Sequence, residues 1–273
     1  MIQKVNYFIT RVFDIILYPF SFIDEFWGIL FLSIVMSFVV LWIYKWVSSP
    51  GAIKATKDKI KASILAIRLY KDLGKVIVAS FFKSLYYTFK YFILNFGPVL
   101  VIIPILFPAF VQMDIRYGME PFKVGDDVVV KARFASDIED LEIKLLENEH
   151  YKLKMNPVFV KALKEVDWKL ETLKPGTTTV KIKVGDNVLE KQLIIGKSRA
   201  AMSNKKMKES SLAHFLYPAE TLLPRESEVA DIYIGYPGHS VSFAGITTHW
   251  LVFNLILVII IVLAFKNRFG VEF

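Results

Sequence analysis

The chain has 273 residues, of which 54% are apolar and 22% are charged, and its mean hydropathy is +0.44. These values are too apolar for an ordinary soluble domain and too charged for a chain made only of membrane spans, so they indicate a membrane protein with a sizeable polar part. The absence of cysteine excludes disulfides, thiolate metal sites and a cysteine nucleophile.

The net charge of +8 is concentrated in one short segment. Residues 49–90 carry nine Lys or Arg and two Asp, whereas residues 113–247 carry twenty basic and twenty acidic side chains. The pI near 9.3 therefore reflects one segment and is no general signature of nucleic-acid binding, so we expect no DNA partner.

Residues 1–26 are predicted to form an amphipathic helix. Apolar residues recur at helical spacing from Val5 to Leu17. A secretory signal peptide is disfavoured, because Arg11 and Asp14 break the apolar run and no small-residue cleavage site follows. The helix is expected either to lie on the outer membrane interface or to pack against the membrane spans.

Three segments are apolar enough to be transmembrane helices, namely 27–47, 91–112 and 248–266. Each approaches the roughly 20 residues that a hydrocarbon core of about 30 Å requires. The basic segment 50–90 lies between the first two spans, so the positive-inside rule places it in the cytoplasm. The N-terminus is then outside and the tail 267–273 inside, which we expect in an inner (cytoplasmic) membrane.

Residues 50–90 are predicted to form a helical hairpin of coiled-coil type. An apolar stripe runs at three- and four-residue spacing from Ile53 to Tyr70, Gly74 is expected to end the first helix, and a second helix continues from Lys75 into the second span. The lysines form a solvated face that attracts anionic lipid headgroups, a face for docking a cytoplasmic partner, or both. The candidate contact residues are Lys54, Lys57, Lys61, Arg68 and Lys71.

Between the second and third spans, residues 113–247 have the pattern of an extracytoplasmic antiparallel β-sandwich. The short sequence Gly185-Asp186-Asn187 predicts a hairpin turn between two strands, whereas the polar segment 197–228 predicts a loop or a short surface helix. The order of a tryptophan-containing strand, a Pro-Gly turn and a hairpin resembles immunoglobulin-like bacterial domains. The strand-like segments are 128–134, 141–145, 166–170, 178–184, 188–195 and the region 231–241.

No group of residues has the spacing of a catalytic centre or a metal site, so we expect neither an enzyme nor a cofactor. The acidic residues Asp126, Asp127, Asp137, Glu139 and Asp140 lack the spacing of a calcium-binding EF-hand loop. Exposed acidic turns are therefore the favoured interpretation of this segment, and calcium binding is the weaker alternative.

Polar side chains inside the predicted spans carry more information, because polar groups are costly in hydrocarbon and often functional. Three prolines in the second span, at 98, 104 and 108, each remove a backbone donor. The polar residues either line a hydrophilic groove among the helices or form ordinary interhelical hydrogen bonds. The candidates for the groove are Ser33, Ser37, Asn95 and Asn254.

The order of these parts resembles the three-span core of the YidC/Oxa superfamily of membrane-protein insertases. The similarity covers 20–112 and is closest in AIKATKDKIKASILAIRLYKDLGK, followed by NFGPVLVIIPILFPAF. It implies an insertase-like chaperone without covalent chemistry, in which a polar groove receives client membrane proteins and the hairpin meets the ribosome or a targeting partner.

The chain also differs from that superfamily. It has a whole external domain between spans two and three, it has no arginine in mid-span, and it lacks the two further spans of the bacterial members. Its C-terminal end resembles that of uncharacterised bacterial membrane proteins. The large external domain favours an alternative function, that of a structural or assembly subunit of an envelope complex that binds other subunits through its sandwich.

The sequence thus predicts an α+β membrane protein with three transmembrane helices, a cytoplasmic helical hairpin and an extracytoplasmic antiparallel β-sandwich.

Overall fold

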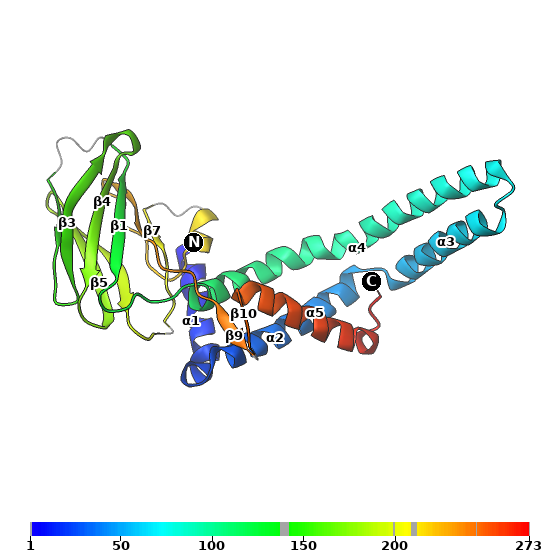
Figure 1. Cartoon of the computed structure of the whole chain (residues 1–273), viewed down its shortest axis with the longest axis horizontal. Coiled ribbons are helices and arrows are strands. Elements are labelled where there is room, and N and C mark those ends of the chain that lie inside the picture. The colour runs from blue at the N-terminus through cyan, green and yellow to red at the C-terminus, as the bar shows by residue number, and fades with distance from the viewer. Residues whose placement is uncertain (1, 137–141, 199, 209–211, 244, 273) are drawn as a thin grey trace. The chain divides into compact units, whose positions relative to one another are not determined.

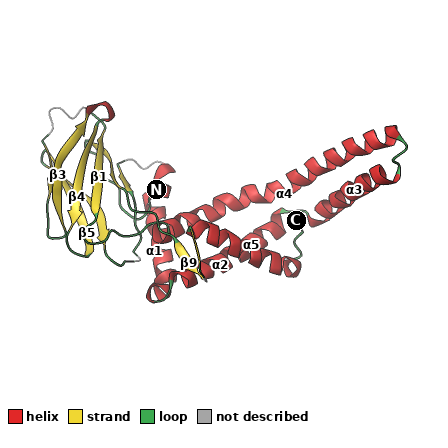
Figure 2. Cartoon of the chain, in the orientation of Figure 1, coloured by secondary structure: helices red, strands yellow, loops and turns green. Residues whose placement is uncertain are grey.

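The computed structural model describes residues 2–136, 142–198, 200–208, 212–243 and 245–272. The described chain is an α+β protein of α-helices and antiparallel sheets (Figures 1 and 2). It divides into two compact units, one made of residues 1–28 and 108–250 and the other of residues 29–107 and 251–273.

Three helices are long and apolar enough to cross a membrane, which confirms the predicted number and approximate place of the apolar helices. They are α2 (Glu25–Val47), α4 (Gly74–Tyr117) and α5 (Trp250–Phe269). Helices α2 and α5 are rich in Leu, Ile, Val and Phe, interrupted by polar residues such as Ser33, Ser37 and Asn254. Helix α4 stays continuous through Pro98, Pro104 and Pro108.

Helix α3 (Pro50–Leu69) and the first part of α4 run antiparallel as a hairpin (Figure 1). The expectation that Gly74 ends the first helix was wrong, because Gly74 begins α4. Helix α3 ends earlier, where the Tyr70 amide donates to the Ala66 carbonyl at 3.0 Å. The chain then reverses over four residues, closed by a Leu73 to Tyr70 hydrogen bond at 3.0 Å.

Two antiparallel sheets form the β-structure of the other unit. The five-stranded sheet has the order β3-β4-β1-β8-β7 and the three-stranded sheet the order β2-β5-β6. In the first sheet the strands are β3 (Tyr151–Val160), β4 (Glu165–Thr172), β1 (Asp127–Phe134), β8 (Val229–Ile234) and β7 (Lys205–Met207). In the second they are β2 (Ile143–Leu146), β5 (Gly176–Val184) and β6 (Asn187–Ile195).

Side chains from both sheets share one apolar core. Alternate residues of β4, including Trp168 and Leu170, are buried in it together with Val180 of β5 and Leu193 of β6. The alternation predicted this antiparallel β-structure. The turn at Gly185 also forms as predicted, since Val184 pairs with Asn187 and Gly185 has the positive φ of 56° that favours glycine there.

Two parts of the β-structure differ from the expectations. Strand β3 went unpredicted, because Asn156 and Pro157 interrupt its alternation and its register with β4 shifts twice. The segment 197–228, expected to be a loop or surface helix, contains strand β7 and the 3-10 turn η3 (Leu212–Leu216). A small hairpin of β9 (Val241–Phe243) and β10 (Ile246–Thr248) precedes α5. Leu141, expected to begin a strand, lies outside the described residues.

The N-terminal helix α1 (Ile2–Leu17), followed by the turn η1 (Tyr18–Phe22), belongs to the same unit as the sheets. Its apolar side is the exposed one, with Phe8 68% and Ile15 75% exposed. Its polar side is turned inward, where Asn6 donates to the carbonyl oxygen of His214 at 2.8 Å. This orientation is the reverse of that of a helix on a soluble protein, and it leaves an apolar surface uncovered.

Candidate functional site

Three of the four polar residues proposed for a groove meet between α2 and α5. Ser33, Ser37 and Asn254 are all fully buried. The amide nitrogen of Asn254 donates to Ser33 Oγ at 2.7 Å, which joins the two helices. The two serines lie on one face of α2 because they are four residues apart, and each hydroxyl donates to a backbone carbonyl one turn earlier.

The carbonyl oxygen of the Asn254 side chain has no hydrogen-bond partner among the described residues. Its surroundings include the sulfur of Met36, which lies 3.9 Å from the Asn254 amide nitrogen. A buried polar atom without a partner costs about 1–3 kcal/mol. The oxygen is therefore an acceptor that a polar group entering between these helices could use.

Asn95 forms a separate contact between α2 and α4. The hydroxyl of Tyr44 donates to Asn95 Oδ1 at 2.7 Å, and Asn95 Nδ2 donates to the carbonyl oxygen of Tyr91 at 2.8 Å. Tyr44 follows Ser37 by two helical turns, or about 10 Å along α2. The four candidate residues thus form two polar contacts along α2, one toward each of the other apolar helices.

Helix α4 packs through a single narrow row of side chains in its apolar part. Pro98, Ile102 and Leu106 are buried at four-residue spacing. The large apolar residues on its other sides are exposed, including Phe92, Ile93, Phe96, Leu100, Ile103 and Ile105. A helix with this pattern offers most of its surface to lipid or to another apolar helix.

The basic residues predicted to contact a cytoplasmic partner lie on the hairpin, most of them exposed. Lys54, Lys61, Arg68 and Lys71 are exposed, whereas Lys57 is half-buried, with its ammonium group 5.8 Å from the centre of the Tyr91 ring. That position allows a cation–π interaction between α3 and α4. Lys57 therefore has a packing role in the hairpin as well as a charge.

A polar cluster at the C-terminal end of α4 was missed by the sequence analysis. Arg116 is 8% exposed and pairs with Asp14 of α1 at 2.5 Å. It also donates to Gln112 Oε1 at 2.6 Å, and Gln112 donates to the hydroxyl of Thr10 at 3.0 Å. The four-residue spacing of Gln112 and Arg116 was a signal for this cluster, but Gln112 is the last residue of the predicted second span and Arg116 lies beyond it.

We compared the chain with protein-family models, curated proteins and solved structures. None of them matches it. The resemblance to the YidC/Oxa superfamily therefore stays a prediction.

The acidic segment considered for calcium lies only partly in the described structure. No group of three or more metal-binding side chains is found among the described residues, and Asp137, Glu139 and Asp140 lie outside them. Within the described part, Asp127 pairs with Lys154 at 2.6 Å and Lys169 at 2.9 Å, and these two lysines lower its pKa. Asp127 is thus used in surface ion pairs, and Asp126 Oδ2 accepts a hydrogen bond from the backbone amide of Lys123 at 2.7 Å.

Proposed function

We propose that α2, α4 and α5 span an inner (cytoplasmic) membrane, with the α3–α4 hairpin in the cytoplasm and the β-sheet unit outside. The length and hydropathy of the three helices support this placement. The charge of residues 49–90 supports the orientation, because basic loops are retained in the cytoplasm. The exposed apolar side of α1 supports a position of that helix on the outer interface.

In this membrane, we propose that the protein is an insertase-like chaperone for client membrane proteins. The observation that carries the proposal is the side-chain oxygen of Asn254, which has no hydrogen-bond partner among the described residues although it lies beside Ser33 in the contact between α2 and α5. A polar group of a client that enters this contact would gain a hydrogen bond there, which offsets part of its cost of leaving water. The sparse packing of α4 supports this proposal, because its exposed face could receive an apolar client helix.

The test uses the full-length protein in liposomes and a single-span client with a short polar N-terminal tail. Protease protection of the tail measures insertion. Asn254→Leu and Asn95→Leu are expected to lower the fraction inserted several-fold while expression stays unchanged. Asn267→Leu is the matched control, because Asn267 is exposed near the C-terminal end of α5 and should behave as the parent protein. Equal insertion by all of these proteins would reject the groove.

The hairpin is proposed to contact the ribosome, a targeting partner or anionic lipid through its exposed basic residues. Replacing Lys54, Lys61, Arg68 and Lys71 by Gln should weaken cosedimentation with ribosomes if the hairpin docks there. The half-buried Lys57 is kept in this variant so that the hairpin stays packed. Unchanged cosedimentation, with reduced binding to anionic vesicles, would assign these charges to lipid alone.

A second function is favoured by one specific observation on the β-sheet unit. Strand β3 is an edge strand, and its Met155, Val158 and Phe159 are 57%, 55% and 47% exposed. Apolar side chains on a sheet edge are a common basis for protein contacts. They support the alternative that the protein is a structural or assembly subunit of an envelope complex.

Purification of the full-length protein in mild detergent, with mass spectrometry of copurifying proteins, separates the two functions. Ribosomal proteins and a varied set of small membrane proteins would support the insertase. One or two partners at fixed stoichiometry, lost when Met155, Val158 and Phe159 are changed to Thr, would support the subunit instead. In that outcome the groove would be abandoned as a client site.

A further inference from the structure

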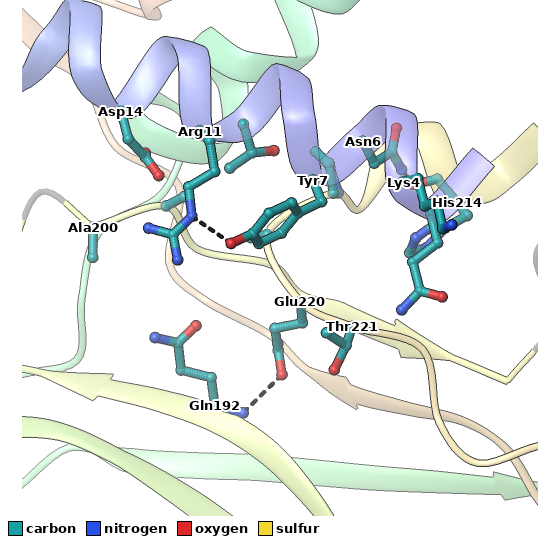
Figure 3. Close-up of a pocket in the computed structure, with 15 residues that line it drawn as sticks. Lys4, Asn6, Tyr7, Arg11, Asp14, Gln192, Ala200, His214, Glu220 and Thr221 are labelled. Atoms are coloured by element: carbon teal, nitrogen blue, oxygen red, sulfur yellow. Dashed lines mark hydrogen bonds between the residues drawn. The ribbon is translucent and has the colours of Figure 1, made fainter. Parts of the chain in front are cut away.

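A pocket of about 660 Å³ lies inside the β-sheet unit, between α1 and the residues of the sheet and loop that face it (Figure 3). One wall is formed by α1, with Lys4, Tyr7 and Arg11. The opposite wall is formed by Gln192 of β6 and by the segment that contains His214 and Thr221. Pockets of this size hold small molecules or large polar headgroups, and this one is larger than a single inorganic ion requires.

The acidic groups at this pocket are already paired. Glu220 forms an ion pair with the buried Lys191, and its second oxygen accepts a hydrogen bond from the backbone N–H of Gln192 at 2.9 Å. Asp14 is paired with Arg116. Their charges are therefore compensated within the protein.

Lys4 and Arg11 are the cations that line the pocket, and the charge of Asp14 acts on Arg11 as well as on Arg116. Neither Lys4 nor Arg11 has an acidic partner within ion-pair distance among the described residues. Arg11 donates its Nε–H to the hydroxyl of Tyr7 at 3.1 Å, which holds the guanidinium group beside the cavity (Figure 3). Its two terminal nitrogens form no hydrogen bond with the described residues. A pocket whose free charges are an ammonium and a guanidinium group attracts an anion, and the guanidinium fork suits the oxygens of a phosphate.

His214 provides an independent sign of a ligand. It is 2% exposed, it lines the same pocket, and its Nδ1 atom has no hydrogen-bond partner among the described residues. Burial lowers the pKa of His214, so its imidazole is neutral near pH 7 and can donate or accept one hydrogen bond. A buried ring nitrogen without a partner costs free energy. A ligand hydroxyl or phosphate oxygen would recover that free energy after a small shift of the side chains that cover the Nδ1 atom.

The position of Lys4 and Arg11 on α1 indicates which kind of molecule carries the anionic group. Lys4 lies four residues before Phe8, and Arg11 lies four residues before Ile15, so each cation neighbours an exposed apolar side chain on the helix surface. A molecule bound there would meet a basic pocket and an apolar surface side by side. A phospholipid has both complementary parts, a phosphate and acyl chains.

We propose that this pocket binds the phosphodiester headgroup of an anionic phospholipid, with Lys4 and Arg11 on the phosphate and His214, Gln192 and Thr221 near the polar headgroup substituent. The bound lipid would attach α1 to the rest of its unit at the membrane surface. This site is independent of the proposed insertase function, since it uses none of the groove residues.

The experiment is a lipid titration of the full-length protein in detergent, followed by native mass spectrometry. The probes are dioleoylphosphatidylglycerol, dioleoylphosphatidylcholine and the soluble headgroup analogue glycerol 1-phosphate. The test variant is Lys4→Gln/Arg11→Gln, in which both side chains are exposed, so folding should be preserved. The matched control is Lys208→Gln/Arg225→Gln, which removes the same charge from the same unit and leaves the pocket residues intact.

The parent protein is expected to bind phosphatidylglycerol in preference to phosphatidylcholine. The affinity of the Lys4/Arg11 variant for phosphatidylglycerol is expected to be lower by a factor of about ten or more. The control should bind as the parent does. Equal affinity of the test variant and the control would overturn the site and assign lipid binding to other charges, such as those of the hairpin. If glycerol 1-phosphate binds as tightly as the lipid and competes with it, the phosphate site stands but the lipid source is refuted.

Discussion

The ion pair between Lys191 of β6 and Glu220 is buried in the β-sheet unit. Lys191 is completely buried, and its ammonium group also donates to the carbonyl oxygen of Ser203 at 2.5 Å. The change Glu220→Gln removes the only carboxylate that pairs with this ammonium among the described residues. It leaves a buried charge whose remaining partners are neutral.

Breaking a buried pair on one side costs about 3–5 kcal/mol, because the remaining charge has neither water nor a counter-charge. Complete burial of Lys191 and the additional loss of the Gln192 amide hydrogen bond argue for the upper part of this range. For a unit of this size, that loss lowers the melting temperature by about 10 °C or more.

The effect should depend on pH. Burial lowers the pKa of Lys191 from its ordinary value of 10.5, and Glu220 opposes that shift. In Glu220→Gln the folded-state pKa falls further, so the unfolded chain binds more protons at pH values between this pKa and 10.5. Stability of the variant therefore rises with pH in that window. The deficit relative to the parent should be largest near pH 7 and smaller near pH 10.

Thermal unfolding followed by near-ultraviolet circular dichroism of the full-length protein in detergent measures the change. Glu190→Gln is the control, because the Lys181–Glu190 pair on β5 and β6 is half-exposed at 3.4 Å and should contribute under about 1 kcal/mol. A Glu220→Gln protein that melts within 2 °C of the control at pH 7 would refute the argument that Lys191 is buried as a charged group. Restored stability in Lys191→Met/Glu220→Leu would support it.

Two further predictions concern single hydrogen-bond networks. Asp14→Asn should speed amide hydrogen exchange in α1 about tenfold, because the partners of Arg116 that remain are neutral. Unchanged exchange would show that the ion pair between Asp14 and Arg116 does not hold α1 in place. Tyr236→Phe should destabilise the unit by about 1–2 kcal/mol in the same unfolding assay, because the buried backbone N–H of Ile194 loses the hydroxyl oxygen that accepts its hydrogen bond at 3.1 Å. A variant as stable as the parent would show that this hydrogen bond does not contribute to stability.

Local patterns were sufficient to predict most of the elements. Long apolar runs predicted α2 and α5, and alternation of apolar and polar residues predicted β1, β4, β5 and β6. These patterns predict the elements because helices and strands have fixed periods, so a buried side requires apolar residues at a fixed spacing in the sequence. Strand β3 escaped prediction, since an edge strand with Pro157 needs no strict alternation.

The contacts among the candidate groove residues could not be predicted from local patterns. The spacing of Ser33 and Ser37 placed both on one face of α2, but their meeting with Asn254, more than two hundred residues away, depends on how α5 packs. The same holds for the pairing of Tyr44 with Asn95, which the sequence analysis did not connect. Whether a polar residue finds a partner is decided by neighbours that no periodicity specifies.

The sequence by itself determined the apolar helices, the basic hairpin and the alternating strands, because each depends on the local order of residues. Only the tertiary structure decided which polar groups are paired and which are left over. It turned the polar side of α1 inward, placed Lys191 against Glu220, and left the side-chain oxygen of Asn254 and the Nδ1 atom of His214 without partners among the described residues. Those outcomes depend on distances between segments far apart in the chain, and the burial of a charge or an amide acquires its energetic cost only when those segments pack.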